Sequence, residues 1–227
     1  MELAIDTSTP DASIAFSSEG QIIAELTWHS GQNHTLELMP NLSCLLRLNE
    51  LTVKDIGGIA VARGPGSFNG LRVGLSAAKG LAFALNVPLV GISTLEVEAF
   101  PLAASTLPIC PISNAGRGEI ATAIFQLINE KWCRVLEEHI ATIDSLVSTI
   151  RGPTIFCGRI ESQVKSVLRE RLGTSALIVE GAGSLRRAGY LAELGWRRLS
   201  KGDYDLVATL QPLYLRNPSI TISSHRH

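Results

Sequence analysis

The chain has 227 residues, of which 45% are hydrophobic and 18% are charged, and its formal net charge is −1. This length is enough for one large domain or two small lobes with a buried core. The balanced charge provides no global basic field of the kind that nucleic-acid-binding proteins present. No stretch is apolar enough to span a bilayer, because Lys79 interrupts the best candidate, and the first residues lack the features of a secretory signal.

The first half of the chain predicts three strands, a helix, a strand, a helix, a strand and a helix. The expected strands cover residues 3–5, 13–16, 21–28, 59–62 and 89–92, and the expected helices cover 36–48, 71–85 and 95–103. Pro40 lies within the first helix, where it is tolerated only near the first turn.

The second half repeats this order of elements. The sequence similarity between the two halves is weak, so the repeat rests on the element order alone. The expected strands cover residues 109–112, 120–127, 132–139, 154–157 and 176–179, and the expected helices cover 143–150, 164–172 and 190–194. Three strands joined by tight turns are antiparallel, and later strands that enter through helices are parallel. The order predicts a duplicated α/β protein of the actin-like ATPase fold, with lobes at 1–104 and 105–227.

The four cysteines, at positions 44, 110, 133 and 157, include no C-x-x-C pair. They indicate reduced thiols in a cytoplasmic protein rather than a disulfide framework or a zinc site. His29 and His34 are five residues apart and would point about 140° apart on a helix, so they could not share a metal. A capping or interface role is expected for His34 instead.

A glycine-rich segment, RGPGSFNGLRVG at residues 63–74, follows a predicted strand and opens a helix. Its free N–H groups predict an anion or nucleotide site at Gly64, Gly66 and Ser67, although the segment lacks the Walker A ending and the dinucleotide spacing. The alternative is a connector that needs glycine for its backbone angles. The sequence leaves these two interpretations even.

Asp6 follows the first strand, where a carboxylate could hold a magnesium–phosphate assembly. The matching turn of the second half offers Asn114, which supplies no charge and no base. The alternative for Asp6 is an Asx turn with the residues that follow it, which is the commoner role of Asp before Thr-Ser-Thr.

Gly70, Gly74 and Ala78 recur every four residues and form a smooth stripe on their helix. Such a stripe lets another helix approach closely, either within the chain or from another subunit. A basic cluster near the C-terminus offers contacts to RNA phosphates or to an acidic partner, or is a solvated face. Its members are Arg186, Arg187, Arg197, Arg198 and Lys201.

Several motifs resemble the TsaB (YeaZ) family in order and spacing. They are AIDTST at 4–9, NHT at 33–35, LMP at 38–40, GPGSFNGLRVG at 64–74, GISTL at 91–95 and PLYLRN at 212–217. The resemblance implies a non-catalytic subunit that binds and activates a TsaD-type transferase, which a TsaE-type ATPase joins. The assembly transfers threonylcarbamoyl to N6 of the tRNA adenosine beside the anticodon. This chain is therefore expected to associate with tRNA indirectly, through the complex.

The resemblance further implies that the first two helices make the partner contact. The candidate interface residues are His34, Leu38, Leu42, Gly70, Arg72, Gly74 and Ala78. No cofactor is expected to bind this chain tightly, with ATP or ADP and Mg²⁺ expected only at the assembled complex, and the isolated chain could pair with itself. If the glycine stripe were buried against the chain's own sheet, it could not serve as a contact for a helix of another subunit.

The chain departs from the family pattern at Asn114 and Gly116, which stand where Asp and Arg are usual. This loss argues against independent nucleotide chemistry, unless Arg117 replaces the arginine. Two alternatives remain: an autonomous actin-like ATPase or kinase relative that uses Asp6 and the glycine-rich loops, and a metallopeptidase, for which the histidine spacing provides no metal ligands.

Overall fold

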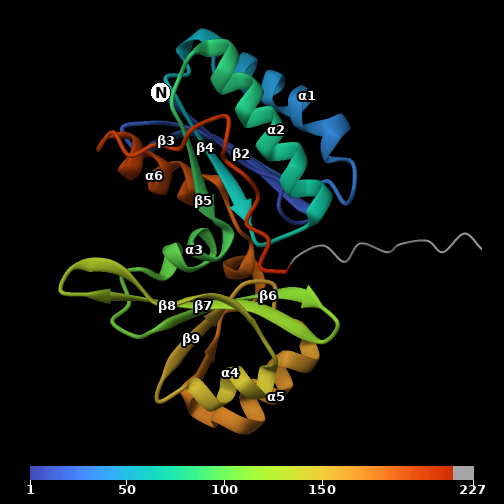
Figure 1. Cartoon of the computed structure of the whole chain (residues 1–227), viewed down its shortest axis with the longest axis vertical. Coiled ribbons are helices and arrows are strands. Elements are labelled where there is room, and N and C mark those ends of the chain that lie inside the picture. Colours follow the sequence, from blue (N-terminus) through green and yellow to red (C-terminus); the bar gives the residue numbers. More distant parts are fainter. Residues whose placement is uncertain (217–227) are drawn as a thin grey trace, which may run out of the picture.

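The computed structural model describes residues 1–216, so Asn217 of the last motif and the C-terminal tail lie outside the described residues. The first lobe contains a five-stranded sheet in the order β3-β2-β1-β4-β5 (Figure 1). Its strands are β1 (Glu2–Asp6), β2 (Asp11–Ser18), β3 (Gln21–His29), β4 (Gly58–Gly64) and β5 (Leu89–Ser93). The β1–β2 and β2–β3 pairs are antiparallel, and the β1–β4 and β4–β5 pairs are parallel.

The second lobe repeats this topology with a sheet in the order β10-β9-β6-β7-β8. Its strands are β6 (Ile109–Gly116), β7 (Glu119–Ile128), β8 (Lys131–Ala141), β9 (Thr154–Cys157) and β10 (Ala176–Ile178). Here too the first three strands are antiparallel, and the last two join in parallel. The duplicated α/β arrangement expected from element order is confirmed.

The helices cover the sheets in layers. They are α1 (His34–Leu48), α2 (Phe68–Leu85), α3 (Thr94–Ala99), α4 (Ile143–Thr149), α5 (Ser162–Leu172) and α6 (Ala188–Leu199). Figure 1 shows α1 and α2 on one face of the first sheet, α6 on its other face, and α3 between the two lobes. Among residues 1–216, no helix combines the length and apolar character needed to cross a membrane.

The alternation of side chains along β1 and β4 assigns each face of the first sheet its helices. Leu3, Ile5, Ile59 and Val61 point into the core beneath α1 and α2. On the opposite face, the small residues Ala4, Ala15, Ala60 and Ala62 pack against α6. A Cβ built on Gly195 of α6 would lie 2.4 Å from the Ala60 Cβ, so this helix needs glycine to approach so closely.

This packing corrects the expected lobe boundary. Residues 105–227 were expected to form the second lobe, but α6 packs on the sheet of the first lobe, and Leu210 lies in the core beneath α1 and α2. The chain returns because a sheet with two apolar faces needs cover on both, and α1 and α2 supply only one. The second lobe therefore lies between β6 and β10.

The small-residue stripe of α2 is sealed inside the molecule. Gly70, Gly74 and Ala78 are buried. A Cβ built on Gly70 would lie 2.1 Å from the Thr7 carbonyl oxygen, and one built on Gly74 would lie 2.4 Å from Thr7 Oγ1. The Thr7 hydroxyl donates a hydrogen bond of 2.7 Å to the Gly70 carbonyl. The stripe serves close packing of α2 on this chain's own β1 turn, so its use against a foreign helix is wrong.

Pro40 lies beyond the first turn of α1, as the seventh residue of the helix. The expectation that it sits near the helix start is wrong. Proline lacks the N–H that would bond the Leu36 carbonyl. Because the helix face at Leu36 and Pro40 is exposed, water can satisfy that carbonyl.

All four cysteines are free thiols. Cys110 and Cys157 are buried, and burial raises the pKa of the Cys110 thiol to about 12. Such a thiol stays protonated and packs as a small apolar group.

Candidate functional site

Asp6 lies at the carboxyl end of β1, on the face of the sheet that α6 covers. Its Oδ1 accepts hydrogen bonds from the Ser8 amide at 2.9 Å and from the Ser8 hydroxyl at 2.5 Å. This is the Asx-type turn that the sequence allowed. The second oxygen, Oδ2, accepts a hydrogen bond of 2.6 Å from Arg186 Nε.

Arg186 connects two carboxylates in the space between the lobes. Its Nη2 reaches Asp6 Oδ1 at 3.4 Å, and its Nη1 reaches Glu98 Oε2 on α3 at 3.1 Å. The exposed side-chain fractions are 9% for Arg186, 4% for Asp6 and 11% for Glu98. The ligand positions that a magnesium–phosphate assembly would need on Asp6 are therefore taken by a side chain of the same molecule.

The two carboxylates respond differently to the shared guanidinium. Burial opposes ionisation of Asp6, but the charge and hydrogen bonds of Arg186 and the Ser8 bonds hold its pKa below the usual value. Burial raises the pKa of Glu98 above the usual value, and Arg186 only partly offsets this. The difference follows from geometry, because Asp6 receives two contacts from Arg186 and Glu98 receives one.

The glycine-rich segment packs as a connector. The Ser67 amide donates to the Ser8 carbonyl at 2.7 Å, and Ser67 Oγ accepts the Gly70 amide at 3.3 Å as the N-cap of α2. A Cβ built on Gly66 would lie 2.5 Å from the Ser8 carbonyl oxygen, and one built on Gly64 would lie 2.7 Å from the Leu213 carbonyl oxygen. Backbone atoms occupy the side of Gly64 and of Gly66 on which a side chain would lie, which fits the connector interpretation, and the expected nucleotide contact at Gly64, Gly66 and Ser67 stays a prediction.

The C-terminal segment, residues 212–216, crosses the mouth of the space between the lobes. The Leu213 amide donates to the Arg63 carbonyl at 2.7 Å. The Tyr214 ring lies 5.3 Å from the Phe68 ring, and Arg72 lies 3.8 Å from the centre of the same ring. The start of α2 thus packs against residues 213–214, which are distant from it in sequence.

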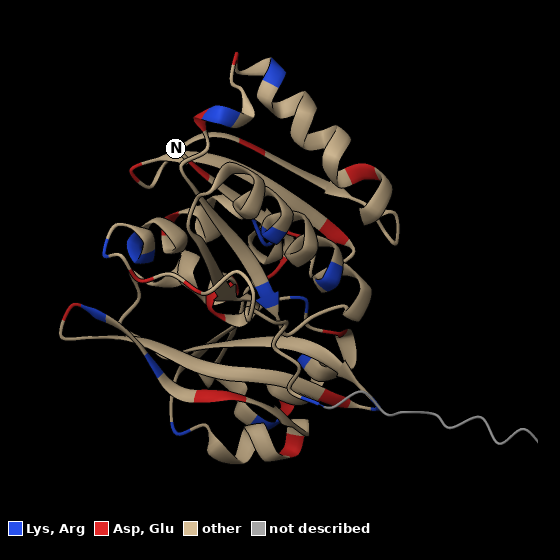
Figure 2. Cartoon of the chain, turned by 45° about the horizontal axis from the view of Figure 1, so that its top comes forward, with Lys and Arg blue, Asp and Glu red and all other residues tan. Residues whose placement is uncertain are grey.

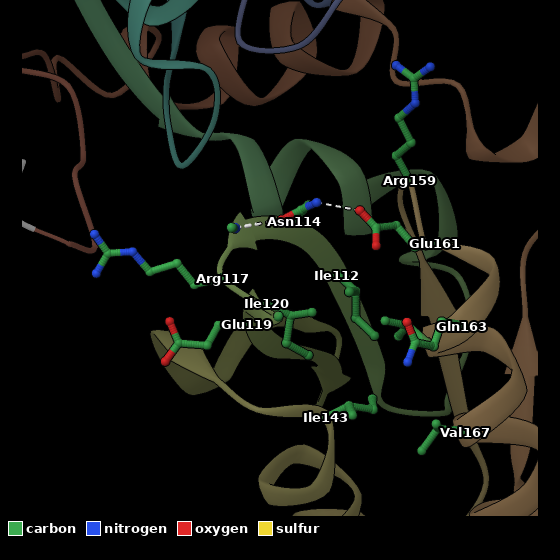
Figure 3. Close-up of a pocket in the computed structure, with 13 residues that line it drawn as sticks. Ile112, Asn114, Arg117, Glu119, Ile120, Ile143, Arg159, Glu161, Gln163 and Val167 are labelled. Atoms are coloured by element: carbon green, nitrogen blue, oxygen red, sulfur yellow. Dashed lines mark hydrogen bonds between the residues drawn. The ribbon is translucent and has the colours of Figure 1, made fainter.

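Asn114 serves its own lobe instead of facing Asp6. Its Oδ1 accepts the Gly116 amide at 2.6 Å, and its Nδ2 donates to Glu161 beside α5. Figure 3 shows this turn at the edge of a cavity of about 210 Å³ with an apolar floor, while Arg117 and Arg159 extend away from it. Arg117 lies one residue after Gly116, the position at which the family usually carries arginine, and its replacement of that arginine stays a prediction.

The outer surface of α1 and α2 is apolar. Leu36 is 75% exposed and Phe83 is 85% exposed, and Met39 and Phe68 are also exposed. A groove of about 380 Å³ runs between the two helices, and Met39, Val73 and Ala77 contribute to its walls. Large apolar side chains exposed on two neighbouring helices favour a surface that another molecule covers.

Comparison with known proteins gives one consistent family. Residues 22–166 match the family model described as TsaD, tRNA N6-adenosine threonylcarbamoyltransferase. The chain is 32% identical over 217 residues to the tRNA threonylcarbamoyladenosine biosynthesis protein TsaB of Bacillus subtilis, covering 94% of this chain and 93% of that relative. The chain belongs to the TsaB (YeaZ) family.

Solved structures agree with the fold of this TsaB-family chain. YeaZ from Pseudomonas aeruginosa superposes with a TM-score of 0.77 at 23% identity, covering 94% of this chain and 99% of that one. The ethanolamine utilization protein EutJ from Carboxydothermus hydrogenoformans superposes with a TM-score of 0.55 at 11% identity, covering 85% and 89%. The duplicated actin-like fold is confirmed.

Most residues expected at the partner interface of the TsaB-family chain are buried in its own core. These are His34, Leu38, Leu42, Gly70, Gly74 and Ala78. Arg72 is exposed, but Phe68 and Tyr214 hold its side chain. The helices named by the resemblance do carry an apolar outer surface, but its residues are Leu36, Met39, Phe68 and Phe83.

The basic cluster consists largely of ion-paired side chains. Arg186 holds Asp6 and Glu98, and Arg187 pairs with Glu25. Further along, Arg197 pairs with Glu193 at 2.6 Å, and Arg198 pairs with Asp203 at 2.9 Å and Asp205 at 3.3 Å. Arg186 and Arg187 therefore already have carboxylate partners in this chain, while Lys201 forms no ion pair within residues 1–216, and a contact of the cluster with RNA or with an acidic partner stays a prediction.

The histidines lie apart from one another. His29 Nδ1 lies 2.7 Å from Asp11 Oδ1 at the surface, and His34 is buried in the first turn of α1. The residues from 1 to 216 contain no group of three His, Cys, Asp or Glu side chains placed to hold a metal ion.

Proposed function

We propose that this TsaB-family chain is a non-catalytic subunit in the biosynthesis of threonylcarbamoyladenosine on tRNA, and that it binds and activates a TsaD-type transferase. A TsaE-type ATPase joins the assembly, and this chain associates with tRNA indirectly, through the complex. ATP or ADP with Mg²⁺ belongs to the assembled complex, and the free chain holds no tightly bound cofactor. The free chain pairs with itself when its partner is absent.

The observation that carries this proposal is the apolar surface of α1 and α2. Leu36 and Phe83 are almost fully exposed on two adjacent helices, with a groove between those helices. Exposing such side chains to water is unfavourable. Burying them against a partner contributes roughly 25 cal/mol of favourable free energy for each Å² of apolar surface buried. The match to a TsaD family model and to curated TsaB proteins supports the choice of partner.

The state of Asp6 supports the non-catalytic part of the proposal. An actin-like ATPase needs a free carboxylate for its metal ion, and here Arg186 neutralises Asp6. The corresponding turn of the second lobe presents Asn114, which hydrogen-bonds within its own lobe. The glycines at 64 and 66 also serve close approach of the chain's own backbone, since a Cβ on either would clash with a carbonyl oxygen.

The double variant Leu36→Glu with Met39→Glu tests the surface. Both side chains are exposed, so the chain is expected to stay folded while its affinity for the same organism's TsaD-type subunit falls at least tenfold, about 1.4 kcal/mol. Gel filtration of co-expressed subunits and titration calorimetry measure the loss. Leu206→Glu is the matched control, because Leu206 is 74% exposed but lies outside both helices. Equal affinity for the wild-type chain and the double variant would contradict the proposed interface.

The isolated chain is also expected to release no ADP from Mg-ATP above the background of a coupled assay. The physical reason is that Asp6 has no free oxygen to hold the metal. Steady turnover that disappears in Asp6→Asn would favour the autonomous ATPase instead.

A further inference from the structure

A cavity of about 580 Å³ opens between the lobes, away from Asp6, and Arg63 is its one lining residue from the glycine-rich segment. Its walls come from the ends of β4 and β5, the start of α3, the last turn of α6 and the beginning of β8. Neither Asp6 nor Gly66 nor Ser67 lines it. Its chemistry is therefore independent of the closed site described above.

The charges around this cavity are strongly unbalanced for a chain of net charge −1. The acidic residues that line it are Glu96 and Asp203. The basic residues that line it are Arg63, Lys131, Arg134, Arg197, Arg198 and Lys201. Figure 2 shows Lys and Arg on both α6 and the β7–β8 hairpin, at the same end of the molecule. Like charges gathered around a concave surface attract an anion.

Half of these basic groups are already compensated. Arg134 contacts Glu96 at 3.5 Å and Glu138 at 3.4 Å, and Arg197 and Arg198 have the carboxylate partners given above. The other three, Arg63, Lys131 and Lys201, form no ion pair with any residue from 1 to 216. Three cations therefore remain available to a ligand.

Arg63 is half-buried and its stem packs against the neighbouring strand β5. A Cβ on Gly91 would lie 3.1 Å from Arg63 Cδ, so the absence of a side chain at Gly91 makes room for the arginine stem. The Arg63 Nε atom is buried and has no hydrogen-bond partner. A buried donor without an acceptor costs about 1–3 kcal/mol, and an oxyanion that enters the cavity would remove that cost.

We propose that this cavity binds a small molecule that carries two or more phosphate groups. Arginine and lysine are the usual partners of phosphate oxygens, and three separate cations match several charges better than one. The volume exceeds that of a single phosphate and lies in the range of small-molecule sites. A terminal phosphate can reach the half-buried Arg63, whereas the backbone of an RNA helix stays at the rim.

The rigid aromatic wall supplies a readout. Trp132 lies in the cavity wall, and its ring stacks on Phe125 at 5.5 Å and meets Phe100 edge-on at 5.9 Å. Its fluorescence should respond to an anion that binds beside it, and a Trp132→Phe variant identifies its share of the signal.

The test titrates the full-length chain with sodium pyrophosphate and separately with ATP, by calorimetry and by tryptophan fluorescence, with sodium sulfate at equal ionic strength as the reference. Saturable binding of pyrophosphate, at least tenfold tighter than sulfate, is expected. Tighter binding of ATP than of pyrophosphate would assign a nucleoside polyphosphate, and equal binding would assign the phosphates alone.

The double variant Lys131→Glu with Lys201→Glu should weaken pyrophosphate binding at least tenfold and leave the circular-dichroism spectrum unchanged. Arg47→Glu with Lys54→Glu is the charge-matched control, because both residues are exposed and lie outside the cavity. Equal losses in the two double variants, no saturable pyrophosphate or ATP binding, or RNA binding that pyrophosphate does not displace would overturn the proposal. The measurement needs no transferase subunit, so its outcome is separate from that of the proposed partner interface.

Discussion

Gly70→Ala is expected to lower the free energy of unfolding by about 3 kcal/mol, at the upper end of typical overpacking costs. The added methyl group would lie 2.1 Å from the Thr7 carbonyl oxygen, and a backbone atom cannot move aside as a flexible side chain can. It would also crowd the buried ring of His34, whose Cδ2 lies 3.2 Å from the built Cβ. Urea denaturation followed by circular dichroism measures the change.

Gly80→Ala is the matched control in the same helix. No atom lies within 4 Å of a Cβ built there, so only the intrinsic helix preference changes, and a gain of roughly 1 kcal/mol is expected. The two substitutions are chemically identical, but their expected effects on the free energy of unfolding are opposite in sign. A Gly70→Ala variant as stable as Gly80→Ala would contradict the tight packing of α2 on the β1 turn.

Arg186→Met is expected to lower the free energy of unfolding at pH 7 by about 3–5 kcal/mol. Methionine keeps part of the buried volume but leaves Asp6 and Glu98 without their shared cation. Two buried carboxylates then face each other, and each loses the interaction that favoured its charged form. Denaturation at pH 7 measures the loss, with Arg197→Met as the control because Arg197 is exposed and forms an ion pair only with Glu193 among the described residues.

The pH dependence distinguishes this electrostatic account from simple loss of packing. In the wild type, the lowered pKa of Asp6 contributes stability that is present above its usual value near 3.8 and is lost as the pH falls through the folded-state pKa. The raised pKa of Glu98 acts in the opposite direction, so protonation near and above pH 4.5 favours the folded state. In Arg186→Met both pKa values are expected to rise. The variant should therefore lose less stability at pH 5.5 than at pH 7, whereas an equal loss at both pH values would indicate packing alone.

The order of elements was predictable because each lobe repeats simple local signals. Alternating apolar residues defined the strands, and the apolar helical pattern after the glycine-rich segment predicted α2, although its start lies at Phe68 rather than at residue 71. The return of α6 to the first sheet was not predictable, since residues 188–199 carry no signal that says which sheet they cover. The alanines of β1 and β4 hold that information only once their common face is known.

The site was predicted less well, for reasons that are also physical. Asp6 was found by its position after a strand, but its partner Arg186 lies 180 residues away, inside what looked like a surface basic cluster. The glycine stripe gave the right property, close approach, and the wrong neighbour, because a helical period does not reveal which face meets the sheet. The exposed apolar residues Leu36 and Phe83 were missed, because the apolar pattern that defines a helix does not separate core residues from outer ones.

The most direct test measures threonylcarbamoyladenosine formed on tRNA by a reconstituted system that contains this chain, the TsaD-type transferase and the TsaE-type ATPase, with threonylcarbamoyl adenylate as the donor and Mg-ATP present. Three variants are compared with the wild type: Ser67→Gly, Asn114→Ala, and the double variant Leu36→Glu with Met39→Glu. The account predicts near wild-type formation with the first two and a loss of at least tenfold with the third. Loss of product with folded Ser67→Gly or Asn114→Ala, together with full product from the double variant, would contradict it.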